Sequence, residues 1–421
     1  MNIKSLLLGS AAALVAVSGA RAADAVVAPE PEPVEYVRVC DVYGTSFYYI
    51  PGTEICLKVG GYMRYDIGVG DLFGDLGDFG DETYYKRARF QLRMDARTET
   101  ELGTLRGYAA INFDWRTEDF REQLFDDDGD GFPDNTGFGH DAVNDFGIEH
   151  IYVELGGFRI GVTDSLFSTE TGYASDVVQD GLIAYGPFTT HQIAYTFDAG
   201  NGFSISAAVE EGDDGGPYTT YAEGFTTQTV GGVTVVRPFG FGDHGTVNDY
   251  TPYFVAGAAY SGGIWGASIV GAYDSNQEEF AVKGRIDLRP NDMFSLFVMG
   301  AWTDDGDCEI AFGVVTVSTQ RCFGGGGNGG NYYATWGGDW AVWAGGSARF
   351  NDTFKWNVEF GYNDFGDYSI VSDVNITVVP GFVVTPGVGY KHQDGNADIF
   401  SGPLQEDEDN WGGYLRTQFT F

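Results

Sequence analysis

Arginine recurs at alternate positions in the stretch KRARFQLRMDART, which runs from Lys86 to Thr98. A β-strand sends alternate side chains to opposite faces. As a strand, this segment has a nearly apolar face and a polar face of fixed positive charge. The polar face holds Arg87, Arg89, Gln91, Arg93, Asp95 and Arg97.

A later stretch, DSLFSTETGYASDVVQDGLIAYGP, runs from Asp164 to Pro187 and contains no Lys or Arg. Its four acidic residues are Asp164, Glu170, Asp176 and Asp180. We expect the basic residues that face them to be Arg64, Arg87, Arg89, Arg93, Arg106 and Arg159. Acids and bases on opposite sides of a narrow aqueous gap make a transverse field, which orients dipolar solutes. The alternative is general polarity of a solvated interior.

The stretch DDDGDGFPD resembles a calcium loop, because Asp126, Asp128 and Asp130 stand at alternate positions before Gly131. An EF-hand needs a bidentate Glu at position twelve, where this chain has Gly137. A solvated acidic loop is therefore the favoured interpretation, and weak divalent binding stays open. We expect no metal site otherwise and no cofactor.

Composition and charge narrow the class of protein. The chain has 421 residues and a formal net charge of -38, which argues against nucleic-acid binding because that requires a basic face. The counts of Gly 63, Tyr 25 and Phe 32 suit strands and turns better than long helices.

The N-terminus predicts export. Lys4, a short apolar run and the sequence Ala20-Arg21-Ala22 are typical of a signal peptide, expected over residues 1–22, with a mature start near Ala23. A tether and disulfide-bearing segment is expected over 23–54. No later segment has the roughly 20 apolar residues of a spanning helix, so any membrane-embedded part must consist of strands.

Four cysteines follow the signal, as two local couples. Exported proteins can form disulfides, and four cysteines allow three pairings. We favour the local pairing, which joins Cys40 to Cys56 and Cys308 to Cys322. A zinc site is disfavoured because no C-x-x-C or nearby His accompanies them.

From residue 55 to residue 421, segments of about ten residues alternate apolar with polar or small side chains, as in a transmembrane β-barrel. We count roughly sixteen strands, within the range of such barrels. Tight turns alternate with long loops. The expected strands include Ile55–Gly70, Tyr84–Thr98, Leu105–Arg116, Phe158–Thr163 and Trp411–Phe421. The expected turns are Gly156-Gly157, 200–202, Gly262-Gly263, 290–292 and Asn351-Asp352, and the expected long loops are 117–145, 164–187, 212–248, 303–339 and 391–410.

A soluble sandwich would also alternate. Charges in the middle of long strands and aromatic residues near strand ends favour the barrel. The chain ends on WGGYLRTQFTF, which places Phe419 and the terminal Phe421 on one face. A terminal Phe after alternating apolar residues resembles the assembly signal of outer-membrane barrels.

The chain resembles the alphaproteobacterial general porins over essentially its whole mature length. The stretches that carry the resemblance are VEYVRVCDVYGTSFYYIPGTEICLKVGGYMRYD, GGFRIGVTDSLFSTETGY, LIAYGPFTTHQIAYTFDAGNGFS and the C-terminal strand. The resemblance implies a sixteen-stranded barrel in the bacterial outer membrane, usually a homotrimer. It also implies passive diffusion of small hydrophilic solutes and ions, and a third external loop, here 164–187, that folds into the lumen.

Two other classes stay open. A lipase-type barrel enzyme would need a Ser/His pair, but none of the five histidines sits in a G-x-S-x-G motif. A structural or adhesin barrel would need a plugged lumen, and the sequence supplies no separate plug domain. We therefore expect no enzyme activity, and solute flux through lipid bilayers separates the three classes.

Overall fold

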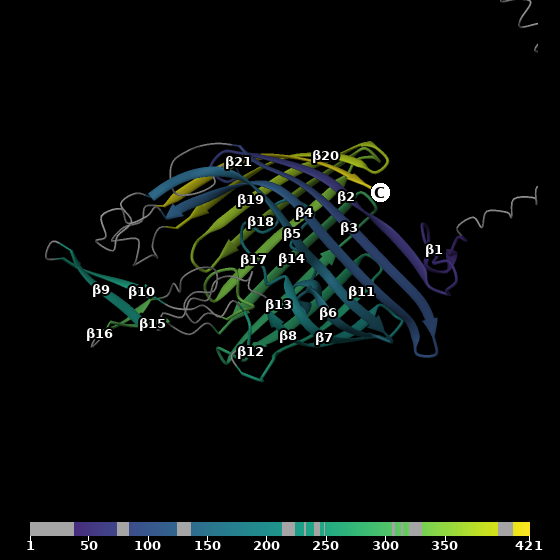
Figure 1. Cartoon of the computed structure of the whole chain (residues 1–421), viewed down its shortest axis with the longest axis horizontal. Coiled ribbons are helices and arrows are strands. Elements are labelled where there is room, and N and C mark those ends of the chain that lie inside the picture. The colour runs from purple at the N-terminus through teal and green to yellow at the C-terminus, as the bar shows by residue number, and fades with distance from the viewer. Residues whose placement is uncertain are drawn as a thin grey trace, which may run out of the picture. The chain divides into compact units, whose positions relative to one another are not determined.

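Sixteen antiparallel strands close into a barrel (Figure 1) in a computed structural model of the chain. Each barrel strand pairs with the next along the chain, and β21 pairs with β2 to close the ring. The structure describes residues 38–73, 84–123, 136–212, 224–230, 233–239, 245–247, 249–304, 308–312, 315–319, 331–394 and 407–421. The barrel strands are β2 (Cys56–Val69), β3 (Tyr85–Thr100), β4 (Gly103–Gln123), β5 (Thr136–Leu155), β6 (Phe158–Asp164), β7 (Thr189–Asp198), β8 (Phe203–Gly212), β11 (Tyr253–Gly262), β12 (Trp265–Asp274), β13 (Glu279–Leu288), β14 (Phe294–Thr303), β17 (Trp340–Arg349), β18 (Phe354–Asn363), β19 (Tyr368–Val379), β20 (Phe382–Gln393) and β21 (Glu408–Thr420).

Short elements supplement the barrel. A 3-10 helix (Asp41–Tyr43) and β1 (Tyr48–Tyr49) precede β2, and α2 (Leu166–Thr169) follows β6. Two hairpins lie in the longer connections: β9 (Gly224–Val230) with β10 (Val233–Phe239), and β15 (Cys308–Phe312) with β16 (Val315–Thr319). In the described part of the chain, every helix is too short to cross a membrane.

The two faces of the strands differ in exposure as the alternation predicts. On β2, Met63 is 56% exposed while its neighbour Tyr62 is 4% exposed. Large apolar side chains are exposed on the outer face of strands all around the barrel, as lipid contact requires. Closure gives every barrel strand two partners, so the backbone polar groups are satisfied within the sheet. The predicted fold class, a barrel of about sixteen strands, is confirmed.

Every connection at one end of the barrel is short, whereas the other end carries the long connections together with two short ones, 275–278 and 364–367, where the expected alternation of tight turns and long loops fails. The five predicted turns all join adjacent strands, as at Gly156-Gly157 between β5 and β6. Both glycines there have positive φ, +57° and +92°. This left-handed backbone suits a two-residue hairpin and favours glycine.

The predicted loop 117–145 is too long and is corrected by the structure. The ladder of β4 and β5 continues from Thr117 opposite Ala142 as far as Gln123 opposite Thr136. Sequence periodicity misses this extension because a strand pair outside lipid needs no apolar face, while its backbone hydrogen bonds form regardless of side-chain type. The predicted loops 212–248 and 303–339 likewise contain the β9–β10 and β15–β16 hairpins.

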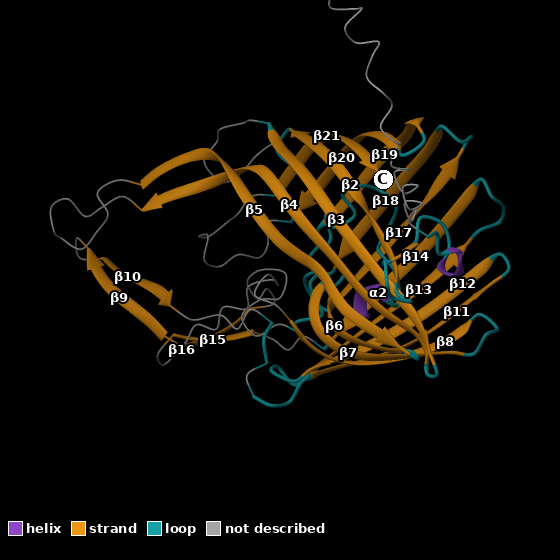
Figure 2. Ribbon diagram, turned by 45° about the vertical axis from the view of Figure 1, so that its right-hand side comes forward, coloured by secondary structure: helices purple, strands orange, loops and turns teal. Residues whose placement is uncertain are grey.

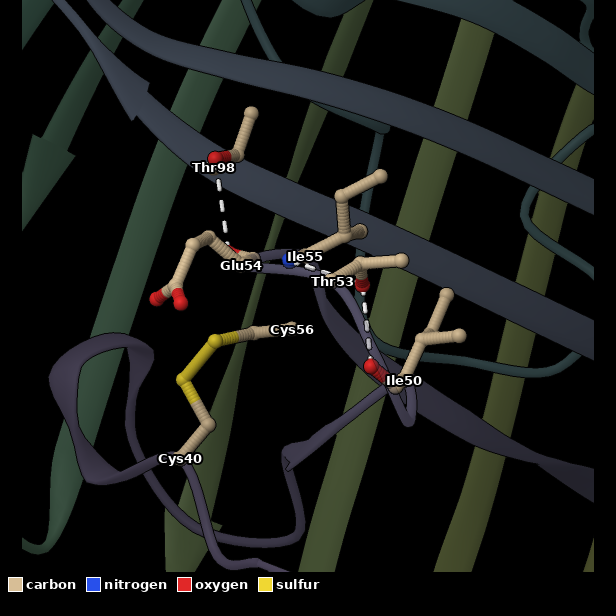
Figure 3. Close-up of a disulfide and its surroundings, with 7 residues drawn as sticks. All are labelled: Cys40, Ile50, Thr53, Glu54, Ile55, Cys56 and Thr98. Atoms are coloured by element: carbon tan, nitrogen blue, oxygen red, sulfur yellow. Dashed lines mark hydrogen bonds between the residues drawn. A yellow bond between two sulfur atoms is a disulfide. The ribbon is translucent and has the colours of Figure 1, made fainter.

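A disulfide joins Cys40 to Cys56, with the Cα atoms 6.0 Å apart (Figure 3). Phe47 packs with both cysteines in a small buried cluster, and the Arg97 guanidinium lies 5.2 Å from the Phe47 ring centroid. The Thr98 hydroxyl donates to the carbonyl of Glu54 in the same region. This predicted disulfide is confirmed. Cys322 and the side chain of Cys308 lie outside the described residues, so their pairing stays a prediction.

Candidate pore constriction

All six sequence-predicted arginines project from the inner face of the barrel. They lie on β2, β3, β4 and β6, at positions that alternate with lipid-facing side chains such as Met63, Phe113 and Ile160. Arg64 stands opposite Arg89 in the ladder, and Arg106 stands opposite Arg97. An outward-facing arginine at the bilayer midplane would cost about 2–4 kcal/mol, which explains why the polar face turns inward.

Acids on the neighbouring strands, and not on the loop, are the direct partners of most of these arginines. The Arg89 guanidinium binds Asp114 with two nitrogens, Nε to Oδ1 and Nη2 to Oδ2, each at 2.7 Å. Asp66 accepts from Arg87 Nη2 at 3.0 Å and from Arg416 Nε at 2.7 Å. These pairs fix the direction of each guanidinium along the wall.

A second network continues the row across β3, β4, β5 and β6. Asp95 accepts from Arg97 and Arg106, with Nη2 to Oδ2 distances of 2.7 Å and 2.9 Å. Glu154 accepts from Arg106 and Arg159, each at 2.8 Å. The network therefore holds three guanidinium groups with two carboxylates, and it keeps a net positive charge.

Arg64 and Arg93 differ from the other wall arginines. Arg64 Nε donates to Gln418 Oε1 at 2.9 Å, and Arg93 Nε donates to Gln91 Oε1. Both guanidinium groups lie over the Tyr62 ring, with Cζ 4.4 Å and 5.4 Å from its centroid. Neither has an ion pair with an acid among the described residues.

The connection between β6 and β7, residues 165–188, begins with α2, which lies among the strands of the barrel (Figure 2). Glu210 of β8, 1% exposed, anchors this start. Its carboxylate accepts from the Ser165 hydroxyl and from the Leu166 backbone N–H, each at 2.7 Å. The Ser165 side chain in turn caps the helix by accepting from the Phe167 N–H.

Basic and aromatic side chains of β13 and β17 hold three further residues of this loop by their carbonyl groups. Lys283 Nζ donates to the carbonyl of Tyr185 at 2.5 Å, and Arg285 Nη1 donates to the carbonyl of Tyr173. Trp343 Nε1 donates to the carbonyl of Ile183 at 2.9 Å. A carbonyl partner holds the chain in place whatever side chain that residue carries.

These anchors lie across the barrel from the arginine wall. Around the ring from β3, the order is β4, β5, β6, β7, β8, β11, β12 and β13, so β13 is the eighth strand away in a ring of sixteen. Such a strand is diametrically opposite. At these anchors the loop is fixed to the wall that faces β3. Its Val178 N–H also donates to Asp373 Oδ2 of β19 at 2.8 Å, and Val177 packs with Val371 of β19 and Tyr414 of β21.

The four predicted loop acids are distributed differently from the expectation. Asp176 pairs with Lys355 of β18, with Nζ to Oδ2 at 2.7 Å. Asp164 accepts from the Tyr173 hydroxyl and Asp180 accepts from the Tyr185 hydroxyl, both within the loop. In the described chain, none of the four forms an ion pair with the six predicted arginines.

Burial sets the protonation of two of these acids. It raises the pKa of Asp180 from 3.8 to about 6, while the hydrogen bond from the Tyr185 hydroxyl and the charge of Arg416 oppose the rise. Burial also raises the pKa of Glu170. The loop therefore carries less free negative charge at mildly acidic pH than its sequence suggests.

Comparison with known proteins identifies the family. A family model described as the porin subfamily matches residues 24–415. The chain belongs to this porin family. Porin Omp2b of Brucella suis and porin Omp2a of Brucella melitensis are each 40% identical to it, with the whole of both chains covered. The outer membrane channel DcaP of Acinetobacter baumannii has a similar fold, with a TM-score of 0.58 at 14% identity, covering 89% of this chain and 99% of that one.

This porin is therefore a multi-pass β-barrel channel of the bacterial outer membrane. That conclusion rests on the family and on the closed barrel together.

The C-terminal phenylalanines lie at the seam where the barrel closes. Phe419 faces outward and is 45% exposed, and the Phe421 backbone exchanges hydrogen bonds with Gly61 of β2. Their part in assembly stays a prediction. Residues 1–22, most of the tether, and Asp126, Asp128 and Asp130 lie outside the described residues. Within the described residues, no group of three potential metal ligands occurs.

Sequence reasoning did not identify Asp66, Asp95, Asp114 and Glu154 as the partners of the arginines, although Asp95 was expected on the same face as the arginines of its strand. A signal was present, because each lies on the same alternate positions as an arginine of its own or an adjacent strand. It also missed Lys283, Arg285 and Lys355, since the sequence does not show which distant strand a loop will contact.

Proposed function

We propose that this porin passes small hydrophilic solutes and ions by passive diffusion between the loop 165–188 and the arginine wall. The observation that carries the proposal is the attachment of that loop to β13, diametrically opposite the arginine-bearing β3. A solute in the lumen would then pass guanidinium groups on one side and the loop on the other. The gap between them sets the size limit, and the fixed charges set ion preference.

The wall charge favours anions at this level. Two networks each hold one more guanidinium than carboxylate, and Arg64 and Arg93 add positive charge. Glu149 removes some of it, since it lies beside Gln91 and Asn112 without an arginine partner in the described chain. The local excess of positive charge contrasts with the net charge of -38 for the whole chain.

We further propose that the porin assembles as a homotrimer and catalyses no reaction. The trimer rests on the resemblance to general porins. The two histidines with described partners, His150 beside Thr163 and His392 beside Asp409, contact no serine hydroxyl in the described chain.

Reconstitution into lipid tests these proposals. The purified protein should give stepwise ion conductance in planar bilayers and should admit small sugars, but not large ones, into liposomes. The unheated protein should migrate in detergent as an oligomer and dissociate on heating. A folded protein that gives neither conductance nor sugar uptake would refute the channel proposal and would favour the barrel-enzyme or adhesin class.

A further inference from the structure

The lumen wall contains two kinds of arginine, distinguished by what neutralises them. Six of them share the carboxylates of Asp66, Asp95, Asp114 and Glu154: Arg87, Arg89, Arg97, Arg106, Arg159 and Arg416. Arg64 and Arg93 contact only neutral groups among the described residues, namely two glutamine amides and the Tyr62 ring. A guanidinium group has five N–H donors and is always charged, so these two retain unused binding capacity.

The contacts of Arg64 and Arg93 orient their free ends. Each uses only Nε toward a glutamine oxygen, so the described chain leaves both terminal nitrogens of each group without a hydrogen-bond acceptor. Both groups lie near the Tyr62 ring, which is 4% exposed, and Arg93 stands opposite Gly60, four residues along β2 from Arg64. A cation over an aromatic face is stabilised without being neutralised. Arg93 is also exposed to the lumen.

Gln91 lies between Arg93 and Glu149, an acid without an ion pair among the described residues. Its Oε1 accepts from Arg93 Nε, while its Nε2 donates to Glu149 Oε2 at 2.7 Å and to Asn112 Oδ1 at 2.9 Å. Gln91 is 2% exposed, so this arrangement is fixed by packing. The amide thus occupies the place where Glu149 could otherwise form an ion pair with Arg93.

We infer that Arg64 of β2 and Arg93 of β3, which flank Tyr62 along the β2–β3 ladder, form a docking site of two separate points, one guanidinium each, for small oxyanions that enter the lumen, such as phosphate or carboxylate groups. The planar fork of terminal nitrogens matches the two oxygens of such groups. The site lies on the conduction path that we have proposed, and the inference rests on that proposed function. Chloride lacks the paired oxygens and gains less from the fork.

Conductance in phosphate tests the site. A channel with a binding site saturates as ion concentration rises, because each ion must leave before the next binds. In planar bilayers, the wild-type conductance in sodium phosphate at neutral pH should saturate, and that in sodium chloride should rise further over the same range. Arg64→Gln/Arg93→Gln should raise the half-saturating phosphate concentration by at least about tenfold, the loss expected for charge-assisted hydrogen bonds.

Two further variants isolate the cause. Arg289→Gln/Arg349→Gln removes the same amount of charge from exposed residues beside the barrel turns. This variant should have the same half-saturating phosphate concentration as the wild type. Arg64→Lys/Arg93→Lys keeps the charge without the fork and should fall between wild type and the glutamine variant. It also serves as the test if the glutamine variant does not assemble.

The outcomes separate the docking site from the channel itself. In one outcome, the wild type, the glutamine variant and the lysine variant all form open channels with the same half-saturating phosphate concentration. That result would overturn the docking site and leave the proposed channel intact. A similar loss in the turn-end control would also overturn it, because total charge would then explain the effect. Absence of wild-type conductance in any salt would refute the proposed function instead.

Discussion

Lys355 of β18 holds Asp176 of the inward loop, with Nζ 2.7 Å from Oδ2. The Asp176 side chain is 57% exposed, so this pair is a solvated contact and contributes about 0.2–1 kcal/mol to docking of the loop. Its main effect is on the charge that a passing ion meets. The loop acid that is most accessible from the lumen is thus already balanced by the wall.

Breaking this pair should shift ion selectivity in a direction set by the charge left behind. Asp176→Asn leaves Lys355 unpaired and should shift the reversal potential in a KCl gradient toward anion preference. Lys355→Met leaves Asp176 unpaired and should shift it toward cation preference. The double variant should return close to wild type. Shifts of the two single variants in the same direction would show that the two charges do not compensate one another.

Lys283 should control how firmly the loop is docked. Its side chain is 0% exposed, its Nζ donates to the Tyr185 carbonyl, and it lies 4.4 Å from the Phe167 ring centroid. Lys283→Met keeps the stem and leaves that carbonyl buried without a donor, at a cost of about 1–3 kcal/mol. We expect noisier single-channel records and a population of undocked loop that rises roughly tenfold. Lys355→Met, at an exposed contact of the same loop, is the control, and equally quiet records in both would rule out the anchor.

The loop should be docked more firmly in acid than at neutral pH. Burial raises the pKa of Asp180 in the docked loop from 3.8 to about 6, so docking favours the neutral carboxyl. The stabilisation of the docked loop by the neutral Asp180 carboxyl is complete below pH 3.8 and decreases as the pH rises to about 6. Above that pH the carboxyl is ionised in both the docked and the undocked loop, so this stabilisation is absent. Current noise should therefore increase between about pH 4 and about pH 7.

Asp180→Asn should remove this increase, because the amide resembles the neutral acid at every pH. Glu359 of β18 and Arg416 of β21 also act on Asp180 electrostatically, and both are retained in the variant. A wild-type increase that persists in Asp180→Asn would assign the pH response to another group.

The Cys40–Cys56 disulfide should stabilise the N-terminal segment and leave the barrel unaffected. It closes a sequence separation of 16 residues, for which loop-closure entropy gives about 3 kcal/mol. The barrel ladder closes through β2 and β21 without it. Cys40→Ser/Cys56→Ser should keep the heat-dependent shift in migration and the channel conductance, while limited proteolysis near Phe47 accelerates. Failure of the variant to assemble would show that the disulfide is needed for closure.

The arginine face was predictable because a two-residue period assigns each side chain of a strand to one face. Pairing across the β3–β4 turn was also within reach, since Thr100 opposite Gly103 fixes Arg89 opposite Asp114. That register shows Asp114 to be the partner of Arg89. The prediction failed there because each strand was considered alone.

The docking of the loop was not predictable from local pattern. Lys283 and Tyr185 are 98 residues apart, and Lys355 and Asp176 are 179 apart. No period relates such residues, because their contact depends on barrel size and on the path of the loop across the lumen. The protonation of Asp180 depends on the same contacts, since burial is its main cause.

If ions pass the arginine wall, the reversal potential of Arg87→Ala/Arg89→Ala in a KCl gradient must differ from that of the wild type. Both side chains are inward-facing, and their removal leaves Asp114 unpaired and Asp66 with Arg416 alone. We expect correctly assembled channels with higher conductance and a shift toward cation preference, because positive charge is lost and the lumen widens. An unchanged reversal potential in channels that assemble normally would contradict this expectation.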